Sequence, residues 1–443
     1  MKTALFSLAV VLFSSASWPA QAASKFIEIP VGGWDPGMQI RKRHEDSIVD
    51  WIRRVDVHPE ALSDNVIEVD LFDAIVRLKR TAGPRLNAAP DPVYVPAGTD
   101  AGAVAAMPSA RLRWTGTMAS TSTSTSTSTS TSTSTSTSKA PSSCVDAERA
   151  VRITEAADGQ LRAIFDIGSF RYELQEGVLI RKDFRRLPRE APVRDVSPDA
   201  LDAVSSDDVE QEAKSTVRVL FGYGTTALGD DREVVFAEMR EAVCLANESF
   251  SHSGIKVELE RAANVLSGYQ ETGVTQTLDD LVAGRRGALG VMHQVRDIEK
   301  ADIVLMIIDT GPSRSVCGQS QRVLATKETA FAVVERNCLG ATTSSLAHEI
   351  GHLFGADHEP ANATVRPPRF SYGHGYKAPE NAPGRWRTLM SYECSGAPCG
   401  RINLWSSPDL SHNGLPAGTK ETHHNVRVLN ETRGVIANFY PEP

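Results

Sequence analysis

The second half of the sequence predicts an α/β domain, and the first half predicts a separate β-rich region. Short apolar runs in the second half alternate with amphipathic stretches, as strands alternate with helices in layered α/β domains. The first half alternates apolar and polar residues around Gly turns, a pattern typical of short antiparallel strands. We therefore expect two structural units within the 443 residues;.

Four apolar runs in the second half predict strands, at 215–224, 254–266, 301–309 and 329–336;. Helices are predicted over 230–250, from Thr277, and over 342–355, where Thr and Ser residues are candidates for the N-cap;. The first of these helices has one apolar face, formed by Phe236, Met239, Val243, Ala246 and Phe250;.

Residues 1–22 have the layout of a cleavable secretory signal peptide. Lys2 precedes an apolar run from Ala4 to Phe13, and Ala20-Gln21-Ala22 forms the cleavage site;. This run is shorter than the roughly 20 residues that span a bilayer, and no later stretch is long and apolar enough to span one. We expect a protein without a membrane span that is secreted, to the extracellular space or the periplasm.

The remaining chain divides into residues 23–213, which are β-rich, and 214–443, which form the α/β domain. A strict Ser/Thr alternation at 120–138 has no apolar side chain to bury, so we expect a flexible insert there;. The acidic stretch 188–214 is expected to be an exposed connector that is open to proteolysis;. The net charge of −8 gives no indication of nucleic-acid binding;.

The six cysteines favour disulfides, because an exported protein enters an oxidising compartment;. Cys317 and Cys338 bracket one segment, and Cys394 and Cys399 are close enough in sequence for a local bridge. Cys144 and Cys244 are left over. Cys244, in an amphipathic helical stretch, is expected to be a buried thiol.

The segment "HEIGHLFGADH", residues 348–358, has the spacing of a catalytic zinc site. His348 and His352 lie one helical turn apart, so both imidazoles can bind one ion. Glu349 points beside the metal, where a carboxylate can act as general base for a metal-held water. Gly355 can end the helix in a left-handed conformation, and His358 then returns as the third ligand. Three ligands leave one coordination position open, as a catalytic Zn²⁺ requires.

This segment resembles the HExxHxxGxxH motif of the metzincin zinc endopeptidases. Further stretches, including "RTLMSY" and "CGRINLWSSPDL", are similar to bacterial reprolysin-like (adamalysin-type) peptidases, nearest to the secreted peptidyl-Asp metallopeptidases. The resemblance covers about residues 215–440. It implies a metzincin-type α/β (α+β) catalytic domain with a mixed twisted sheet, an active-site helix and a Met-turn. It also implies that Met390 packs under the metal and that Tyr392 assists the oxyanion.

The resemblance further implies that residues 23–213 are a propeptide, so that the protein is made as a zymogen. Cys144 then has three possible roles: a ligand that blocks the metal in the zymogen, a disulfide partner of Cys244, or a free thiol. Cleavage after the propeptide leaves five cysteines, one of them unpaired. We expect His374, between the third ligand and Met390, to be a surface residue. The sequence does not show whether structural Ca²⁺ binds.

Several arginines lie near the segment that would wall the substrate cleft. Such a cluster can accept an acidic side chain by bidentate pairing, so an Asp at the scissile bond would favour cleavage. The candidates are Arg366, Arg369, Arg385, Arg387 and Arg401. The expected partners are protein or peptide substrates of a monomer. A peptidase of broad specificity and a non-catalytic zinc-bearing adhesion or binding protein are the alternatives.

Overall fold

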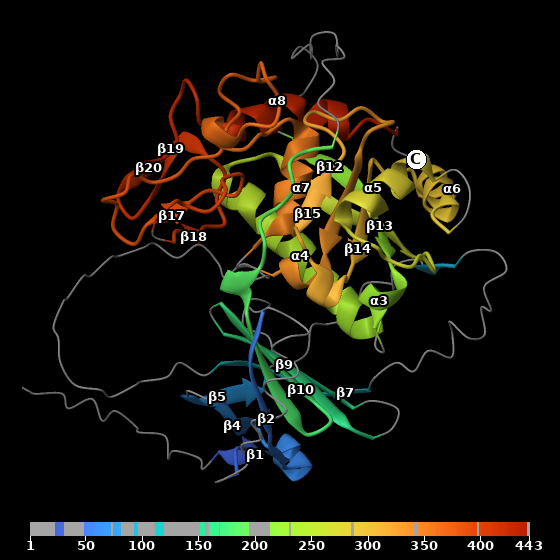
Figure 1. Cartoon of the computed structure of the whole chain (residues 1–443), viewed down its shortest axis with the longest axis vertical. Coiled ribbons are helices and arrows are strands. Elements are labelled where there is room, and N and C mark those ends of the chain that lie inside the picture. The colour runs from blue at the N-terminus through green and yellow to red at the C-terminus, as the bar shows by residue number, and fades with distance from the viewer. Residues whose placement is uncertain are drawn as a thin grey trace, which may run out of the picture.

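The computed structural model contains two β-sheet units stacked along the long axis of the molecule (Figure 1). It describes residues 23–30, 48–71, 74–80, 93–95, 111–118, 151–155, 159–167, 169–194, 213–229, 232–284, 288–340, 343–396 and 398–440. The expected signal peptide, the Ser/Thr insert and Cys144 lie outside these residues. Within them, no helix combines the length and the apolar character needed to cross a membrane.

The N-terminal unit is a ten-stranded sheet with the order β2-β11-β10-β9-β8-β7-β5-β4-β1-β3. Neighbouring strands are antiparallel except for β1 and β4, which are parallel. One cluster of buried residues, which includes Phe26, Ile67 and Phe165, forms its core. The strands are β1 (Ser24–Glu28), β2 (Val49–Arg54), β3 (Asp56–Val57), β4 (Val66–Leu71), β5 (Ala74–Arg80), β7 (Arg111–Met118), β8 (Val151–Glu155), β9 (Leu161–Ile167), β10 (Phe170–Gln175) and β11 (Val178–Asp183).

The C-terminal unit contains a six-stranded sheet with the order β15-β16-β14-β12-β13-β6. All neighbours are parallel except β15, which is antiparallel to β16 and forms one edge of the sheet. The mixed sheet confirms the predicted α/β domain. Its strands are β6 (Val93–Tyr94), β12 (Ser215–Tyr223), β13 (Val257–Leu266), β14 (Ile303–Ile308), β15 (Gly318–Ser320) and β16 (Phe331–Glu335).

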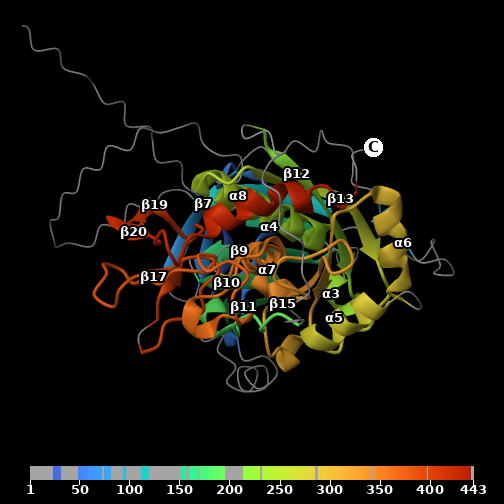
Figure 2. The same cartoon turned by 90° about the horizontal axis from the view of Figure 1, so that it is seen from above.

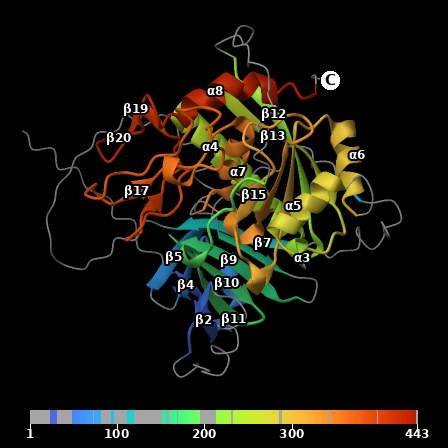
Figure 3. The ribbon, with the colours of Figure 1, turned by 45° about the horizontal axis from the view of Figure 1, so that its top comes forward.

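Helices cover both faces of this sheet (Figures 2 and 3). The core on one face includes residues of α4, α7 and α8, and the core on the other includes residues of α5 and α6. Alternate residues of β14 enter the two cores, which explains why this strand is apolar throughout;. The helices are α3 (Thr225–Leu228), α4 (Arg232–Ser253), α5 (Val274–Ala283), α6 (Gly290–Glu299), α7 (Ser345–Phe354) and α8 (Asn425–Ile436).

The four predicted strands are present as β12, β13, β14 and β16, and the predicted helices as α4, α5 and α7. The apolar face predicted for α4 is buried. Edge strand β15 was not predicted, because it has only three residues, Gly318–Ser320, and none is strongly apolar. Strand β6 belongs to the region before residue 213, yet it pairs with β13, so the first half of the chain also completes the second sheet.

Short strand pairs and disulfides complete the C-terminal unit. β17 (Trp386–Arg387) pairs with β18 (Gly400–Arg401), and β19 (Ser407–His412) pairs with β20 (Leu415–Ala417). Bridges join Cys317 to Cys338 and Cys394 to Cys399, as the sequence suggested. Cys244 is disulfide-bonded, so the expectation of a buried thiol is wrong, and the disulfide that the sequence left open for this cysteine is the alternative that holds. Its partner lies outside the described residues.

The two units are connected by buried ion pairs. Glu238, on α4, binds Arg171 of β10 at 3.0 Å and Arg336 of its own unit at 2.6 Å. The Arg171 and Glu238 side chains are at most 9% exposed. Both charges of a buried ion pair have lost their hydration, so separating them inside the protein is strongly unfavourable. The contact therefore fixes the N-terminal sheet against the α4 side of the second unit.

Candidate metal centre and acid pocket

Helix α7 is buried along its whole length, which is unusual for a helix that has two histidines and a glutamate. It crosses the core between the six-stranded sheet and α4 and α8. Gly355 follows its last residue with a φ of 105°, in the left-handed region;. The chain turns there and returns to place His358 beside the helix.

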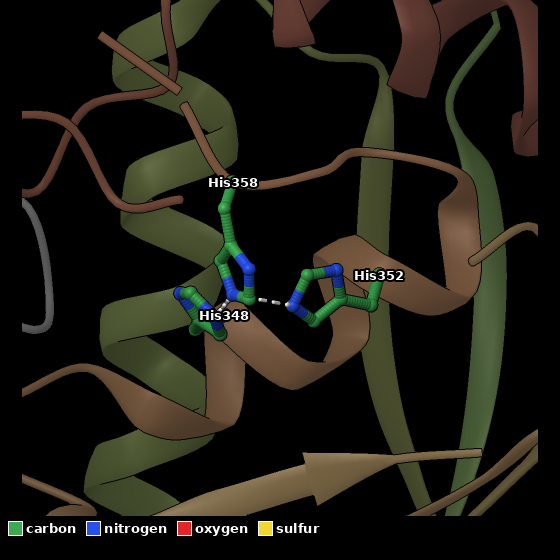
Figure 4. A group of neighbouring side chains, drawn as sticks. All are labelled: His348, His352 and His358. Atoms are coloured by element: carbon green, nitrogen blue, oxygen red, sulfur yellow. Dashed lines mark hydrogen bonds between the residues drawn. The ribbon is translucent and has the colours of Figure 1, made fainter. Parts of the chain in front are cut away.

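His348, His352 and His358 point their Nε2 atoms at one another (Figure 4). His358 Nε2 lies 3.1 Å from both His348 Nε2 and His352 Nε2. Tetrahedral ligation at 2.0–2.1 Å places two nitrogen ligands about 3.3 Å apart, so these distances fit one ion at the centre. All three side chains are fully buried.

Backbone carbonyls fix the protonation of the three rings. His348 Nδ1 lies 2.9 Å from Leu389 O, and His352 Nδ1 lies 2.9 Å from Ala356 O. His358 Nδ1 lies 3.3 Å from Asn362 O. A carbonyl only accepts, so each Nδ1 donates its proton and each Nε2 keeps a lone pair. The lone pair of His358 Nε2 lies 3.1 Å from that of each of the other two rings, and such close lone pairs repel one another unless a cation lies between them.

Burial also favours the neutral imidazoles. It lowers the pKa of His348 to about 3, holds that of His358 well below its usual range, and lowers that of His352;. Neutral imidazole is the form that binds metals. The three neutral imidazoles therefore form a donor set that fits a divalent metal ion.

Glu349 lies beside the triad and is held by the edge strand. Ser320 Oγ, on β15, donates to Glu349 Oε2 at 2.7 Å. Glu349 Oε1 is buried and has no hydrogen-bond partner. Burial raises the pKa of Glu349 well above its usual range, and the Ser320 hydrogen bond opposes the rise;. A buried carboxylate oxygen without a partner marks a place where a polar group binds.

Strand β15 reaches Glu349 because it contains Gly318. A Cβ at Gly318 would lie 2.8 Å from Glu349 Oε1, closer than any real contact. A side chain there would displace the carboxylate. The edge strand therefore contributes both a hydrogen-bond donor and the room that the carboxylate needs.

Met390 lies in the turn Thr388–Ser391, in which Ser391 N donates to Thr388 O. The turn also contains Leu389, whose carbonyl accepts from His348. Met390 is fully buried. A Cβ on Gly351, which precedes the ligand His352, would lie 2.7 Å from Met390 Sδ and 2.6 Å from the Trp405 ring. Met390 thus packs against the turn of α7 that carries the ligands.

Tyr392 and His374 contact the third ligand from two sides. The rings of Tyr392 and His358 are 4.0 Å apart, and the Tyr392 hydroxyl is buried without a hydrogen-bond partner. Burial raises the pKa of Tyr392, so the hydroxyl keeps its proton;. His374 is only 3% exposed, and its Nδ1 bonds to His358 O at 2.8 Å. The expectation of a surface histidine is wrong, because residues 357 and 374 form a β-bridge that brings it inside.

Asp357, which the sequence analysis did not single out, holds the loop of the third ligand. Its carboxylate accepts from the amides of His358 at 2.7 Å, Thr364 at 2.9 Å and Val365 at 3.2 Å. Three backbone donors on one buried carboxylate fix the loop conformation. Its place next to a ligand was the one available signal in the sequence.

The five candidate arginines do not form one cluster. Arg366 is exposed, while Arg369 and Arg385 are partly exposed. Arg387 is buried and donates to Ser391 O at 2.6 Å and to the Glu393 carboxylate at 3.1 Å. Arg401, which pairs with Arg387 across β17 and β18, places its guanidinium in a buried pocket beside the start of α7.

That pocket, which we call the acid pocket, contains a carboxylate from the first half of the chain. Arg401 Nη1 and Nη2 donate to Glu190 Oε1 at 2.6 Å and Oε2 at 2.9 Å. Ser345 Oγ, in the first turn of α7, donates to Oε1 at 3.0 Å. The Arg401 and Glu190 side chains are 3% and 2% exposed. Burial opposes ionisation of Glu190, but Arg401 outweighs it and holds the pKa well below its usual range;.

The part of the sequence that contains these residues matches a known protein family. Residues 223–406 match the profile of Reprolysin_5, metallo-peptidase family M12. This segment is therefore similar to the reprolysin-like domains of that family. It contains the three histidines, Glu349 and Arg401.

Relatives of known name cover more of the chain. The peptidyl-Asp metalloendopeptidase of Stenotrophomonas maltophilia is 31% identical over 290 residues, which are 64% of this chain and 66% of that protein. The protein of the same name from Xanthomonas campestris pv. campestris is 33% identical over 273 residues, 59% of this chain and 62% of that protein. The chain thus spans just under two thirds of the length of these relatives.

A solved structure is also similar, but weakly. Metalloproteinase-II from Bacteroides fragilis is 13% identical, with a TM-score of 0.31, over 66% of this chain and 81% of that chain. The likeness is too low to bear on the fold of this chain.

The contact between Gly351 and Met390 predicts the effect of a single methyl group. We expect Gly351→Ala to lower the free energy of unfolding by about 1–3 kcal/mol, because the rigid Trp405 ring blocks the added Cβ;. Thermal unfolding of the purified protein measures this. Gly434→Ala, a partly exposed position in α8, is the control and should be neutral or slightly stabilising;. Equal unfolding temperatures for the two variants would contradict the packing argument.

Proposed function

We propose that this chain is a secreted zinc-dependent endopeptidase that is made as an inactive precursor and prefers an acidic residue next to the scissile bond. The observation that carries the proposal is the convergence of three neutral imidazole Nε2 atoms beside a buried carboxylate oxygen that has no partner. The match to metallo-peptidase family M12 supports it. The name of the relatives supports the acidic preference.

His348, His352 and His358 would hold the zinc ion through Nε2. Three nitrogen ligands at tetrahedral spacing favour Zn²⁺ over the oxygen-preferring Ca²⁺ and Mg²⁺. When bound, zinc supplies a Lewis acid that activates water and polarises the scissile carbonyl. The carbonyls that accept from the three Nδ1 atoms orient the rings and increase their basicity;. Met390, packed on Gly351, supports the turn of α7 that carries the ligands.

Glu349 would act as the general base. Ser320 holds Oε2, so Oε1 alone faces the attacking water and takes its proton;. The same carboxyl then delivers the proton to the leaving amine. Tyr392 would donate a hydrogen bond to the oxyanion that develops on the scissile carbonyl. Its raised pKa keeps the hydroxyl protonated for that purpose.

The acid pocket would bind the acidic side chain of the substrate. Arg401 presents two N–H groups to one carboxylate, and Ser345 adds a third donor;. Ser345 precedes the ligand His348 by less than one helical turn, so a substrate side chain in the pocket would lie close to the proposed metal site;. An amide or an apolar side chain there leaves the buried guanidinium without a counter-charge, which is costly.

We also propose the processing scheme that the sequence predicted. Residues 1–22 would be removed on export, and residues 23–213 would form a propeptide on the catalytic domain, residues 214–443. The disulfides fit an extracellular or periplasmic protein;. We propose a monomer that acts on protein or peptide substrates.

Glu349→Gln tests the catalytic role. We expect kcat/KM on a peptide substrate to fall about 10²–10⁴-fold, because Gln cannot accept the proton. Stoichiometric zinc, measured by elemental analysis, should remain, since Glu349 is no ligand. Chelation should abolish the activity of the unaltered protein, and zinc should restore it. A Glu349→Gln protein as active as the unaltered one would contradict the mechanism.

Peptides that differ only in the residue after the scissile bond test the acid pocket. We expect kcat/KM for Asp to exceed that for Asn or Leu by at least about tenfold, because a charge-assisted bond contributes about 1.5–3 kcal/mol. Arg401→Met should remove this preference. Arg366→Ala, which changes an exposed arginine of the same predicted set, should leave it intact. Equal rates for Asp and Leu in the unaltered protein would instead support broad specificity.

A further inference from the structure

The chain that follows β11 runs along the outer edge of β15 and does not form the expected exposed connector. Cys317 N donates to Arg189 O at 3.0 Å, and Gly318 O accepts from Ala191 N at 2.8 Å. Ser320 O accepts from Arg194 N at 2.9 Å. Partner numbers rise together, so the segment runs parallel to β15. We call residues 187–194 the docking segment; it rises past α7 and β15 in Figure 1.

The docking segment is buried where it passes the proposed active site. Glu190, Ala191 and Val193 are each at most 5% exposed. The prediction of an exposed connector is therefore wrong for this part. Residues 188–214 are polar and acidic in composition. The side chains that are nevertheless buried have their contact partners in the C-terminal unit. A sequence window does not contain those partners.

Glu190 is the anchor of the docking segment. Its carboxylate accepts from both terminal nitrogens of Arg401 and from Ser345 Oγ, at 2.6–3.0 Å. Removing a charged carboxylate from water is costly unless it is paired and hydrogen-bonded, and here it is both. Glu190 therefore binds in the acid pocket by the pairing that we propose for a substrate carboxylate.

Residues on either side of Glu190 contact Tyr392 and strand β15. The Arg189 guanidinium lies 4.9 Å from the centre of the Tyr392 ring, a cation–π distance;. Gln319 Nε2 donates to Pro192 O at 2.5 Å. Ser320, which accepts from Arg194 through its carbonyl, is the residue that holds Glu349. The docking segment thus contacts residues around Glu349, and none of these contacts involves His348, His352 or His358.

Two prolines keep the docking segment extended. Pro188 and Pro192 lie two residues before and after Glu190. Each fixes its own φ and disfavours the helical region for the residue before it. Less conformational entropy is then lost when the segment binds. This arrangement is typical of an inhibitor that is organised before it binds.

We infer that the docking segment is a built-in pseudosubstrate: Glu190 fills the acid pocket and keeps the precursor inactive until the segment leaves. The inference rests on the proposed endopeptidase function. In this inference the precursor is kept inactive by the ion pair between Glu190 and Arg401, and not by a cysteine bound to the metal. It also makes Ser345 a second determinant of acidic specificity, because Ser345 donates to the same oxygen as Arg401.

Hydrogen exchange measured by mass spectrometry on the full chain tests the docking directly. A Glu349→Gln background prevents self-cleavage and keeps the chain intact. In this background we expect Glu190→Gln to speed exchange in residues 187–194 by about 10-fold or more, because the buried arginine loses its counter-charge. Glu176→Gln, at an exposed turn between β10 and β11, is the matched control and should leave exchange unchanged.

The activity of the precursor tests the inhibition. With Glu349 intact, the Glu190→Gln precursor should cleave the Asp peptide at least about tenfold faster than the unaltered precursor, before any processing. Unchanged exchange in Glu190→Gln would overturn the inference. So would faster exchange with precursor activity no higher than that of the unaltered chain, when the processed protein is active. If neither precursor nor processed protein cleaves, the endopeptidase proposal and the inhibition both fall, and the exchange rates still report whether Glu190 docks the segment.

Discussion

The structure depends on three imidazole lone pairs that meet in the core with no proton between them. Each ring donates its Nδ1 proton to a backbone carbonyl, and the three carbonyls come from different turns: Leu389, Ala356 and Asn362. The helix α7, the turn of Met390 and the loop after His358 must therefore all be in place before the site exists. A cation held between the Nε2 atoms would stabilise all three elements together and would couple metal binding to folding.

Edge strand β15 connects this centre to the docking segment. It has one neighbour in the sheet, β16, so its other edge offers backbone groups to an extended chain;. The same three residues, Gly318–Ser320, leave room for Glu349 and hold it in place. A chain that pairs with β15 is thus held close to Glu349, the proposed general base. The disulfide from Cys317 to Cys338 holds the start of this strand.

Local patterns predicted the elements that are determined by nearby residues. The apolar face of α4 and the histidine spacing on α7 follow the helical period of 3.6 residues, and β14 is a short continuous apolar run;. The sequence missed what distant residues decide. The burial of His374 depends on a bridge to residue 357, and that of Glu190 depends on Arg401, 211 positions away. Likewise, the five candidate arginines differ in exposure, and only the fold shows that Arg401 is the one that pairs with Glu190.

The position of Arg401 connects specificity to latency through one electrostatic requirement. The guanidinium is buried against the carbonyls of Thr343 and Ser391, which satisfy some of its N–H groups but carry no negative charge. A buried cation in this state is unfavourable until a carboxylate arrives. Glu190 meets the requirement from within the chain, and an acidic substrate would meet it after the segment leaves. The two carboxylates compete for one site, so a pocket that binds acidic substrates more tightly also holds its own inhibitor more tightly. Cleavage ends the high effective concentration that the covalent link gives the docking segment. The freed segment then dissociates, and the substrate carboxylate can occupy the acid pocket.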